Sequence, residues 1–313
     1  MVEFKIGQDE SSQRLDRFVR KFLSKAPHSL VYKLIRKKDI KVNGKRARID
    51  YILKEEDRVT LYLSEDRIAL YRQDKKHQPT LQKLRILYED EQIVLVNKPD
   101  KIAVQPDQTK QVSLVDMLLD HCGYDPNSTF RPAFCNRLDK NTTGIVIGAK
   151  TLHALQMINL AIREKKIRKT YRALVVGDLR EPLDLEAYLE RNQRSRRSQV
   201  FSNKKDDSKK IKTRITPVYN EGGFTEIEVD LVTGRTHQIR AHLQHIHHPI
   251  IGDLKYGGRY QGVNSQMLHA HRVEFLELAG KMNYLNGKSF EASFPESYLE
   301  VKKRLFSKSI HSE

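Results

Sequence analysis

The first quarter of the chain carries apolar residues at a helical spacing. They recur at i, i+3, i+4, i+7 and i+8 from residue 15, which predicts one apolar helix face within 12–25: Leu15, Phe18, Val19, Phe22 and Leu23. A second, shorter helix is predicted over 28–38, where Val31, Leu34 and Ile35 face inward. Both helices have an outer face dominated by cations.

An Asn43-Gly44 pair follows these helices, between short runs of alternating apolar and polar residues. This pair is the strongest short-range signal for a β-hairpin, because a type I′ turn needs positive φ at both central positions. A strand predicted over 59–63 then completes a small α+β unit. We expect this unit to span residues 1–64.

Cations gather at the end of the second helix and on the adjoining hairpin. A charge run is usually only a solvated face, but clustering of this kind favours phosphate contacts to RNA. The candidate RNA-binding residues are Arg14, Lys33, Arg36, Lys37, Lys38, Lys41, Asn43 and Lys45.

Residues 65–83 are polar and lack a clear period, which predicts a linker, and residues 84–313 form the second expected domain. Strands outnumber helices in the predicted pattern of this domain. Strands are predicted within 85–99, 144–150, 169–177, 225–234, 268–275 and 288–294, and helices within 113–120, 151–167, 234–246 and 296–306. The charge-rich stretch 191–212 is predicted to be a mobile or RNA-contacting loop.

The composition makes a polyanion the default partner. Lys and Arg number 57 against 40 Asp and Glu, a formal net charge of +17, and nucleic acid is the first candidate. No apolar run approaches the ~20 residues of a membrane helix, and no long amphipathic helix favours a membrane surface. Cys122 and Cys135 have neither zinc-site spacing nor companions, so we expect a cytoplasmic protein.

A histidine-rich patch raises the question of metal binding. It contains His242, His245, His247 and His248, but no carboxylate or cysteine completes a convincing ligand set. A structural or RNA-facing role is favoured, and no metal is expected.

The stretch NRLDKNTTGIVIGAK, residues 136–150, places Asp139 between cations, just before an apolar strand. An arbitrary Asp in this setting is most often part of a surface ion pair. A loop at the mouth of a strand, however, is a usual location for a catalytic side chain. Arg235, in the predicted turn before a helix, could pair with Asp139 and orient it. A positioned carboxylate can act as a nucleophile or stabilise a developing oxocarbenium centre.

Two known families are similar to this chain. Over about residues 12–63 the segments RLDRF, YKLIRKKDIKVNGK and EEDRVTLYL resemble the S4-type RNA-binding domain. Over about 85–295 the segments RLDKNTTGIVIGAK, KTYRAL and TGRTHQIRAHL, with HHPIIGDLKYG, resemble the RluA-type pseudouridine synthases. The resemblance implies an α+β protein, with a mixed, mainly antiparallel sheet in a catalytic domain of the pseudouridine-synthase fold and a small S4-like α/β domain.

The second resemblance implies isomerisation of uridine to pseudouridine in structured RNA. By motif, Asp139 is the essential aspartate, Arg235 its ion-pair partner, and Tyr171 the aromatic residue that stacks on the uracil and assists removal of the C5 proton. Arg137, next to the aspartate motif, joins the RNA-binding candidates. The sequence departs from the commonest family pattern at Asn136, where His is frequent, and at Thr143, where Ser is frequent.

The implied reaction requires no redox change and no net group transfer, so no cofactor is expected. The uridine must be flipped out of its stack, at a cost of a few kcal/mol. Among relatives with this layout large-subunit 23S ribosomal RNA is the commonest implied substrate, so we expect ribosomal RNA rather than tRNA, and a monomeric enzyme. The alternatives are a noncatalytic RNA-binding protein and a glycosidase, which would need a second acid that does not appear near Asp139.

Overall fold

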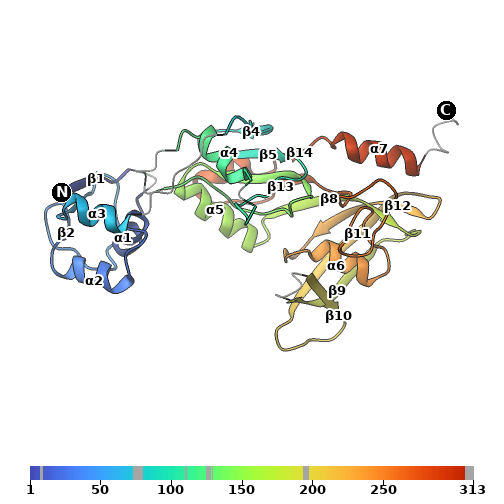
Figure 1. Ribbon diagram of the computed structural model, residues 1–313, viewed down its shortest axis with the longest axis horizontal. Helices are drawn as coiled ribbons and strands as arrows, with labels where there is room; N and C mark the ends of the chain where they lie inside the picture. Colours follow the sequence, from blue (N-terminus) through green and yellow to red (C-terminus); the bar gives the residue numbers. More distant parts are fainter. Residues whose placement is uncertain are drawn as a thin grey trace.

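The computed structural model describes residues 1–7, 10–72, 80–109, 111–124, 128, 130–192 and 197–306. A small N-terminal unit lies at one end of the molecule, and a larger unit is built around one extended sheet (Figure 1). Within these described residues no helix is long and apolar enough to cross a membrane.

The N-terminal unit packs helices against a three-stranded antiparallel sheet of order β1-β3-β2. Both predicted helices are present, and their apolar faces form its core. The elements are β1 (Val2–Lys5), α1 (Leu15–Phe22), α2 (His28–Arg36), β2 (Ile40–Val42), β3 (Arg58–Leu61) and α3 (Glu65–Tyr71).

The predicted turn at Asn43-Gly44 is present, with φ of 51° and 73° at the two residues. The Asn43 side chain donates to Asp57 at 2.7 Å and accepts from the backbone N–H of Arg58 at 2.7 Å. Its amide therefore ties this turn to the start of β3. The turn closes on an isolated bridge between Val42 and Lys45, without the second hairpin strand that the pattern predicts, and the RNA contact expected of Asn43 stays a prediction.

Helix α3 lies where the sequence pattern predicts a linker. Ile68 of this helix is buried in the N-terminal core, and Tyr71 packs against the same cluster. The N-terminal unit therefore extends to about residue 72. The remainder of the expected linker, 73–79, lies outside the described residues.

The larger unit contains an 11-stranded sheet with the main order β10-β9-β11-β12-β8-β13-β7-β5-β4, to which β14 adds at β13 and β6 at β7. Among the described strand pairs only β7–β13 is parallel. The strands are β4 (Ile86–Glu89), β5 (Ile93–Lys98), β6 (Ala133–Phe134), β7 (Thr143–Ala149), β8 (Ile167–Val176), β9 (Leu183–Asn192), β10 (Arg197–Phe201), β11 (Lys209–Glu221), β12 (Phe224–Leu231), β13 (Leu268–Phe275) and β14 (Ser289–Glu291).

Helices cover both faces of this sheet (Figure 1). In the β5–β7 half, alternate strand residues face opposite ways: one face packs on α4 and the other on α5. In the β8–β12 half, α6 and α7 contribute to one large apolar cluster. The helices are α4 (Leu114–His121), α5 (Leu152–Arg163), α6 (Gln238–His245) and α7 (Glu296–Leu305), with a 3₁₀ turn η1 (Gly280–Leu285). The expected α+β class, mixed and mainly antiparallel, is confirmed.

The stretch 191–212, expected to be a loop, is a loop only over 202–208 in its described part; the rest belongs to the end of β9, to β10 and to the start of β11. The ends of β9 and β11 pair in antiparallel register with β10 on the outer edge. Glu186 of β9 lies 2.6 Å from Lys210 and 3.0 Å from Lys212 on the neighbouring strand. The charges that suggest a loop are therefore cross-strand pairs above a buried row containing Ile211 and Val200. Residues 193–196 lie outside the described part.

Strand β13 joins the two halves of the sheet, since it pairs with β8 on one side and with β7 on the other. At the β7 contact the backbones approach closely: a Cβ on Gly144, whose φ is +107°, would lie 2.2 Å from the carbonyl oxygen of Ala270. Only glycine fits this position.

Gly144→Ala should therefore destabilise the protein by more than the backbone strain of a positive φ, which is about 1–2 kcal/mol. We expect a loss of roughly 3 kcal/mol or more in urea unfolding, because the β7–β13 contact must also open. Gly257→Ala is the matched control, because Gly257 has φ of +90° but its Cβ would meet nothing within 4 Å. Equal losses in the two variants would contradict the close approach.

A second prediction concerns His242, which is 2% exposed and places Nδ1 3.0 Å from the Thr213 hydroxyl. Burial lowers the pKa of His242 from 6.5 to about 4. In the unfolded chain the ring binds a proton that the folded state does not, so stability is lost as pH falls from about 6.5 toward 4. We expect this loss to lower the free energy of unfolding by on the order of 1–3 kcal/mol. His242→Gln should flatten this pH dependence, whereas the same change at exposed His28, on α2 of the N-terminal unit, should leave the slope unaltered.

Candidate active site

A cavity of about 770 Å³ lies where the two halves of the sheet meet. The loop before β7 forms one side, and β8, the end of β12 and the start of α6 form the other. Cations dominate its described lining: Arg137, Lys140, Lys165, Arg168, Lys169, Arg191, Arg214, Arg235 and Arg240, against the carboxylates of Asp139 and Asp230. Such a cavity attracts a polyanion.

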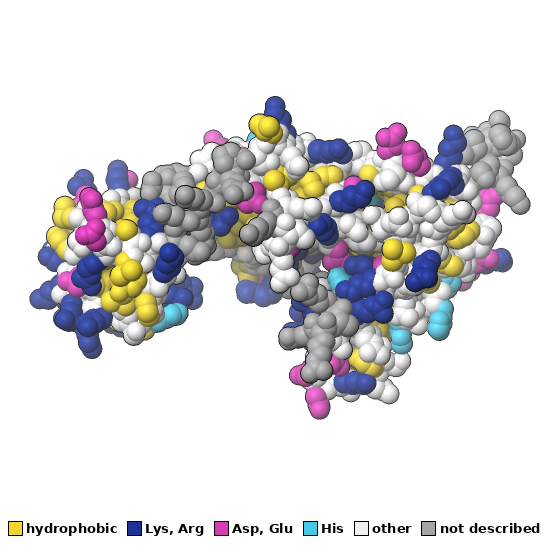
Figure 2. Space-filling model, in the orientation of Figure 1, with side chains coloured by type: hydrophobic (Ala, Val, Ile, Leu, Met, Phe, Trp, Pro, Cys, Tyr) yellow, Lys and Arg dark blue, Asp and Glu magenta, His cyan; other side chains and the backbone are white. Residues whose placement is uncertain are grey.

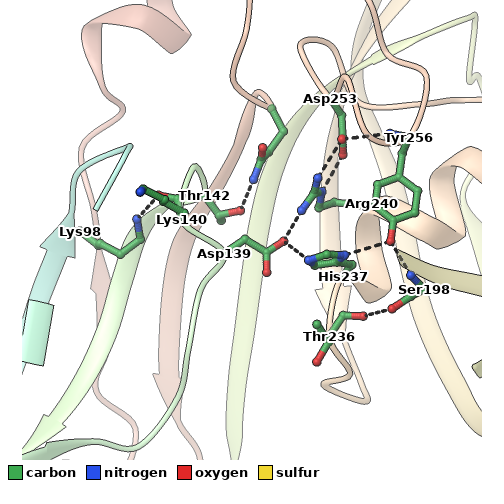
Figure 3. A network of polar contacts seen from close by, with 11 residues as sticks. Lys98, Asp139, Lys140, Thr142, Ser198, Thr236, His237, Arg240, Asp253 and Tyr256 are labelled. Atoms are coloured by element: carbon green, nitrogen blue, oxygen red, sulfur yellow. Dashed lines mark hydrogen bonds and ion pairs between the residues drawn. The ribbon is translucent and has the colours of Figure 1, made fainter. Parts of the chain in front are cut away.

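Lys98, at the end of β5, contacts the loop that carries Asp139 and fixes its backbone (Figure 3). The Lys98 ammonium is fully buried and donates to the carbonyl oxygens of Pro99, Ile102 and Lys140 at 2.7, 2.9 and 2.8 Å. Burial lowers the pKa of Lys98 to about 7, although the charges of Asp100 and Asp139 oppose the shift. Lys98 thereby ties the backbone immediately after Asp139, at Lys140, to the segment that follows β5, at Pro99 and Ile102.

The partner of Asp139 is Arg240, on the first turn of α6 (Figure 3). One guanidinium nitrogen donates to Asp139 Oδ2 at 2.7 Å, while Nε and the other nitrogen form a fork with Asp253 at 2.6 and 2.9 Å. Burial alone would lower the pKa of Arg240, but the hydrogen bonds and charges of Asp253 and Asp139 raise it. Exposure falls from 26% at Asp139 to 9% at Arg240 and 1% at Asp253, so only Asp139 faces the cavity substantially.

The sequence expectation that Arg235 pairs with Asp139 is wrong. Arg235 is exposed in the turn before α6, where its backbone N–H donates to Gln238. It lines the cavity, but the guanidinium that contacts Asp139 is one turn further into the helix, at Arg240. The segment GRTHQIR, residues 234–240, contains both candidate arginines, and the choice between them depended on which face the helix presents.

A chain of polar contacts reaches Asp139 on the same side as Arg240 (Figure 3). The Ser198 N–H donates to the Tyr256 hydroxyl at 2.8 Å, and this hydroxyl lies 3.0 Å from His237 Nδ1. If Tyr256 donates to Nδ1, the His237 proton is on Nε2, which lies 3.8 Å from Asp139 Oδ2. Burial lowers the pKa of His237 despite the nearby Asp139 charge, which favours the neutral ring.

Tyr171, on β8, lines the cavity and is only 5% exposed. Burial first, and then the charge of Asp139, raise the pKa of its phenol. The phenol therefore stays protonated at neutral pH, which favours stacking on a base over direct acceptance of a proton.

The two departures from the family pattern have structural partners. Asn136 Oδ1 accepts the backbone N–H of Ile147 at 2.8 Å, and the Thr143 hydroxyl lies 2.8 Å from His269 Nδ1. Both side chains therefore anchor the loop on either side of Asp139 to the sheet.

Among the N-terminal candidates, five cations are exposed: Lys33, Arg36, Lys37, Lys38 and Lys45. Lys41 lies over the ring of Tyr62 at 4.8 Å, and Arg14 forms a fork with Asp16 at 3.0 Å on both arms. Figure 2 shows Lys and Arg side chains on several sides of this unit. The exposed cations are the ones available to phosphates, together with Arg137 at the cavity.

Two histidines of the histidine-rich patch form hydrogen bonds within the protein, as expected for a structural role. His242 meets Thr213, and His248 Nδ1 lies 2.9 Å from the carbonyl of Val176. The described residues contain no group of three or more His, Cys, Asp or Glu able to hold a metal ion.

Sequence reasoning missed Lys98, Arg240, His237, Tyr256 and Asp253. The segments NKPDKIAVQP, TGRTHQIRAHL and HHPIIGDLKYG contain all five, so their presence in the matching segments was the available signal. Their mutual contacts, over separations such as 101 residues between Asp139 and Arg240, exist only in the fold.

Comparisons with known proteins agree with this architecture. Residues 92–245 match the RNA pseudouridylate synthase family, and residues 13–59 match the S4 domain. Ribosomal large subunit pseudouridine synthase C of Haemophilus ducreyi is 32% identical over 87% of this chain and 87% of its own length. An RNA pseudouridine synthase of Mycoplasma genitalium is 32% identical over 88% of this chain and 90% of its own.

Solved structures show the same fold. Human RNA pseudouridylate synthase domain containing 4 superposes with a TM-score of 0.56 at 19% identity, covering 70% of this chain and 92% of that one. The chain therefore belongs to the RNA pseudouridine synthase family, as an RluA-type member with an N-terminal S4 domain. Both resemblances expected from the sequence are confirmed, and the enzyme class is that of an isomerase acting on RNA.

Asp253→Asn tests the fork that holds Arg240. Once the charge of Asp253 is removed, the Arg240 side chain can rotate away from Asp139. A misplacement near 1 Å can cost about 100-fold in rate. We expect kcat for pseudouridine formation to fall roughly 10- to 100-fold with KM little changed. The matched control is Asp50→Asn, which breaks an exposed fork with Arg48 at 3.1 Å on both arms. A kcat equal to that of the control would show that the second carboxylate does not orient Arg240.

Proposed function

We propose that this enzyme converts uridines of large-subunit ribosomal RNA to pseudouridine, with Asp139 acting at C1′ of a flipped-out nucleotide. The observation that carries the proposal is the position of Asp139: a partly exposed carboxylate in a cation-lined cavity, oriented by Arg240. The names of relatives that align with most of the chain, S4 unit included, support the choice of RNA.

In the proposed reaction the N1–C1′ bond breaks, the uracil turns, and C5 bonds to C1′. The C5 proton is then lost and N1 gains a proton, so the composition of the nucleotide is unchanged. The Asp139 carboxylate stabilises or captures the electron-poor C1′. Tyr171 stacks on the uracil while it turns.

The remaining roles follow from charge and exposure. The exposed cations of the N-terminal unit hold the RNA through phosphates, since they carry no base-reading geometry. Their attraction offsets the few kcal/mol needed to flip the uridine. A monomeric state and a cytoplasmic location stay predictions of the sequence.

Tritium release from 23S ribosomal RNA labelled at uridine C5 tests this proposal. The intact protein should release tritium, and Asp139→Asn should lose at least about 10³-fold in rate, because the group at C1′ is removed. Asp107→Asn is the control, since this exposed carboxylate pairs with the neighbouring Lys140 at 3.6 Å and should keep nearly full activity.

Other results would change the proposal in distinct ways. Release from tRNA but not from 23S RNA would reject the substrate and retain the mechanism. Equal release by Asp139→Asn and the intact protein would reject Asp139. RNA binding without release from either RNA would favour the noncatalytic alternative.

A further inference from the structure

Among the cations that line the cavity, Lys169 is partly buried yet has no anionic partner in the described part of the chain. Lys169 lies on β8 two residues before Tyr171, so the two side chains project from the same face of the strand. Both line the cavity. Within the described part of the chain, Lys169 forms no hydrogen bond and no ion pair.

The neighbouring cations differ from Lys169 in this respect. Arg168 lies 3.3 Å from Glu274, and Lys166 lies 3.4 Å from Glu164. Lys169 is partly buried, and burial lowers its pKa with no carboxylate to oppose the shift. A desolvated ammonium without an anion costs stability, so its place in the cavity indicates a ligand that supplies the negative charge.

The cavity lining on the side of Lys169 includes Ile162 in the last turn of α5, Lys165 between α5 and β8, and Leu276 after β13. The Leu276 N–H donates to the Lys166 carbonyl at 2.9 Å, so these segments adjoin, and we call this part of the lining the Lys169 arm. The charge of Asp139 affects the pKa of Tyr171 and Lys98 but is not among the causes for Lys169. Two residues of strand place Lys169 about 7 Å beyond Tyr171.

We propose that Lys169 binds a backbone phosphate of the RNA strand, at a nucleotide adjacent to the flipped uridine. This assignment rests on the proposed function, because it takes Asp139 to mark C1′ and Tyr171 to mark the uracil. The RNA strand must continue from the flipped uridine to the nucleotides on either side of it, and one of these can lie in the arm beside Tyr171.

Phosphate is favoured over the uracil as the ligand of Lys169. The base occupies the space beside Asp139 and Tyr171, whereas Lys169 lies further along β8. Phosphates are also the groups of RNA that carry a full negative charge before reaction, and a lysine ammonium suits them as a point charge. Lys165, an exposed cation of the same arm, adds to the electrostatic attraction of a phosphate.

Lys169→Met tests the proposal, because Met keeps the length of the side chain and removes its charge. In an Asp139→Asn background, which prevents turnover during the measurement, we expect affinity for 23S RNA to fall roughly five- to twenty-fold. The slope of log K against log salt should become shallower by about 1, as expected for the loss of one phosphate contact. With Asp139 intact, KM should rise while kcat at saturating RNA stays within about threefold.

Lys166→Met is the matched control, since Lys166 is a neighbouring lysine that does not line the cavity and is paired with Glu164. It should leave the salt slope unchanged. Thermal unfolding gives a second readout: Lys169→Met should be at least as stable as the parent protein, because it removes an uncompensated buried charge. Weaker RNA binding in a variant of equal or greater stability cannot come from misfolding.

Two results would overturn the proposal. An unchanged affinity and salt slope would show that Lys169 contacts no phosphate. A fall in kcat at saturating RNA with affinity unchanged would instead place Lys169 on the reacting base. If the intact protein modifies tRNA and not 23S RNA, the substrate proposal fails separately, and the same changes in affinity and slope are expected on tRNA.

Discussion

The guanidinium of Arg240 lies between the carboxylates of Asp139 and Asp253, and the parts of the chain that form the cavity meet at this group. Three charges of this kind are costly to bury unless each is paired, and removing one partner typically costs about 3–5 kcal/mol. The fork with Asp253 uses two guanidinium nitrogens and leaves the third for Asp139. Helix α6 therefore presents the Arg240 guanidinium in a fixed position to Asp139, which stays partly exposed to the cavity.

Asp139 is fixed from the other side by contacts that involve no carboxylate. Lys98 holds the carbonyl that follows it, and Gln266 donates to the Thr142 hydroxyl at 3.1 Å. These contacts come from both halves of the sheet, because Lys98 ends β5 and Gln266 precedes β13. Asp139 thus lies on a loop whose geometry is set by the sheet to which it is tied.

The sequence predicted those features that depend on neighbours along the chain. The turn at Asn43-Gly44 follows from positive φ, and Asp139 was located by its motif and its place before a buried strand. The partner of Asp139 depended on helix orientation, and the resemblance alone assigned the wrong arginine. The loop expected over 191–212 is shorter than predicted for a related reason: Lys210 and Lys212 pair with Glu186 on the neighbouring strand β9, which composition cannot reveal.

Strand β13, which joins the two halves of the sheet, comes late in the sequence relative to the residues that it brings together. Asp139 belongs to the half of the sheet that contains β7, whereas Tyr171 and Arg240 belong to the half that contains β8, and β13 lies between them. Strand β13 follows in sequence every other residue that lines the cavity, apart from its own Leu268 and from Leu276 just after it. Asp139, Tyr171 and Arg240 are therefore synthesised before the strand that brings the two halves of the sheet together, and the cavity between them can form only once β13 has been made.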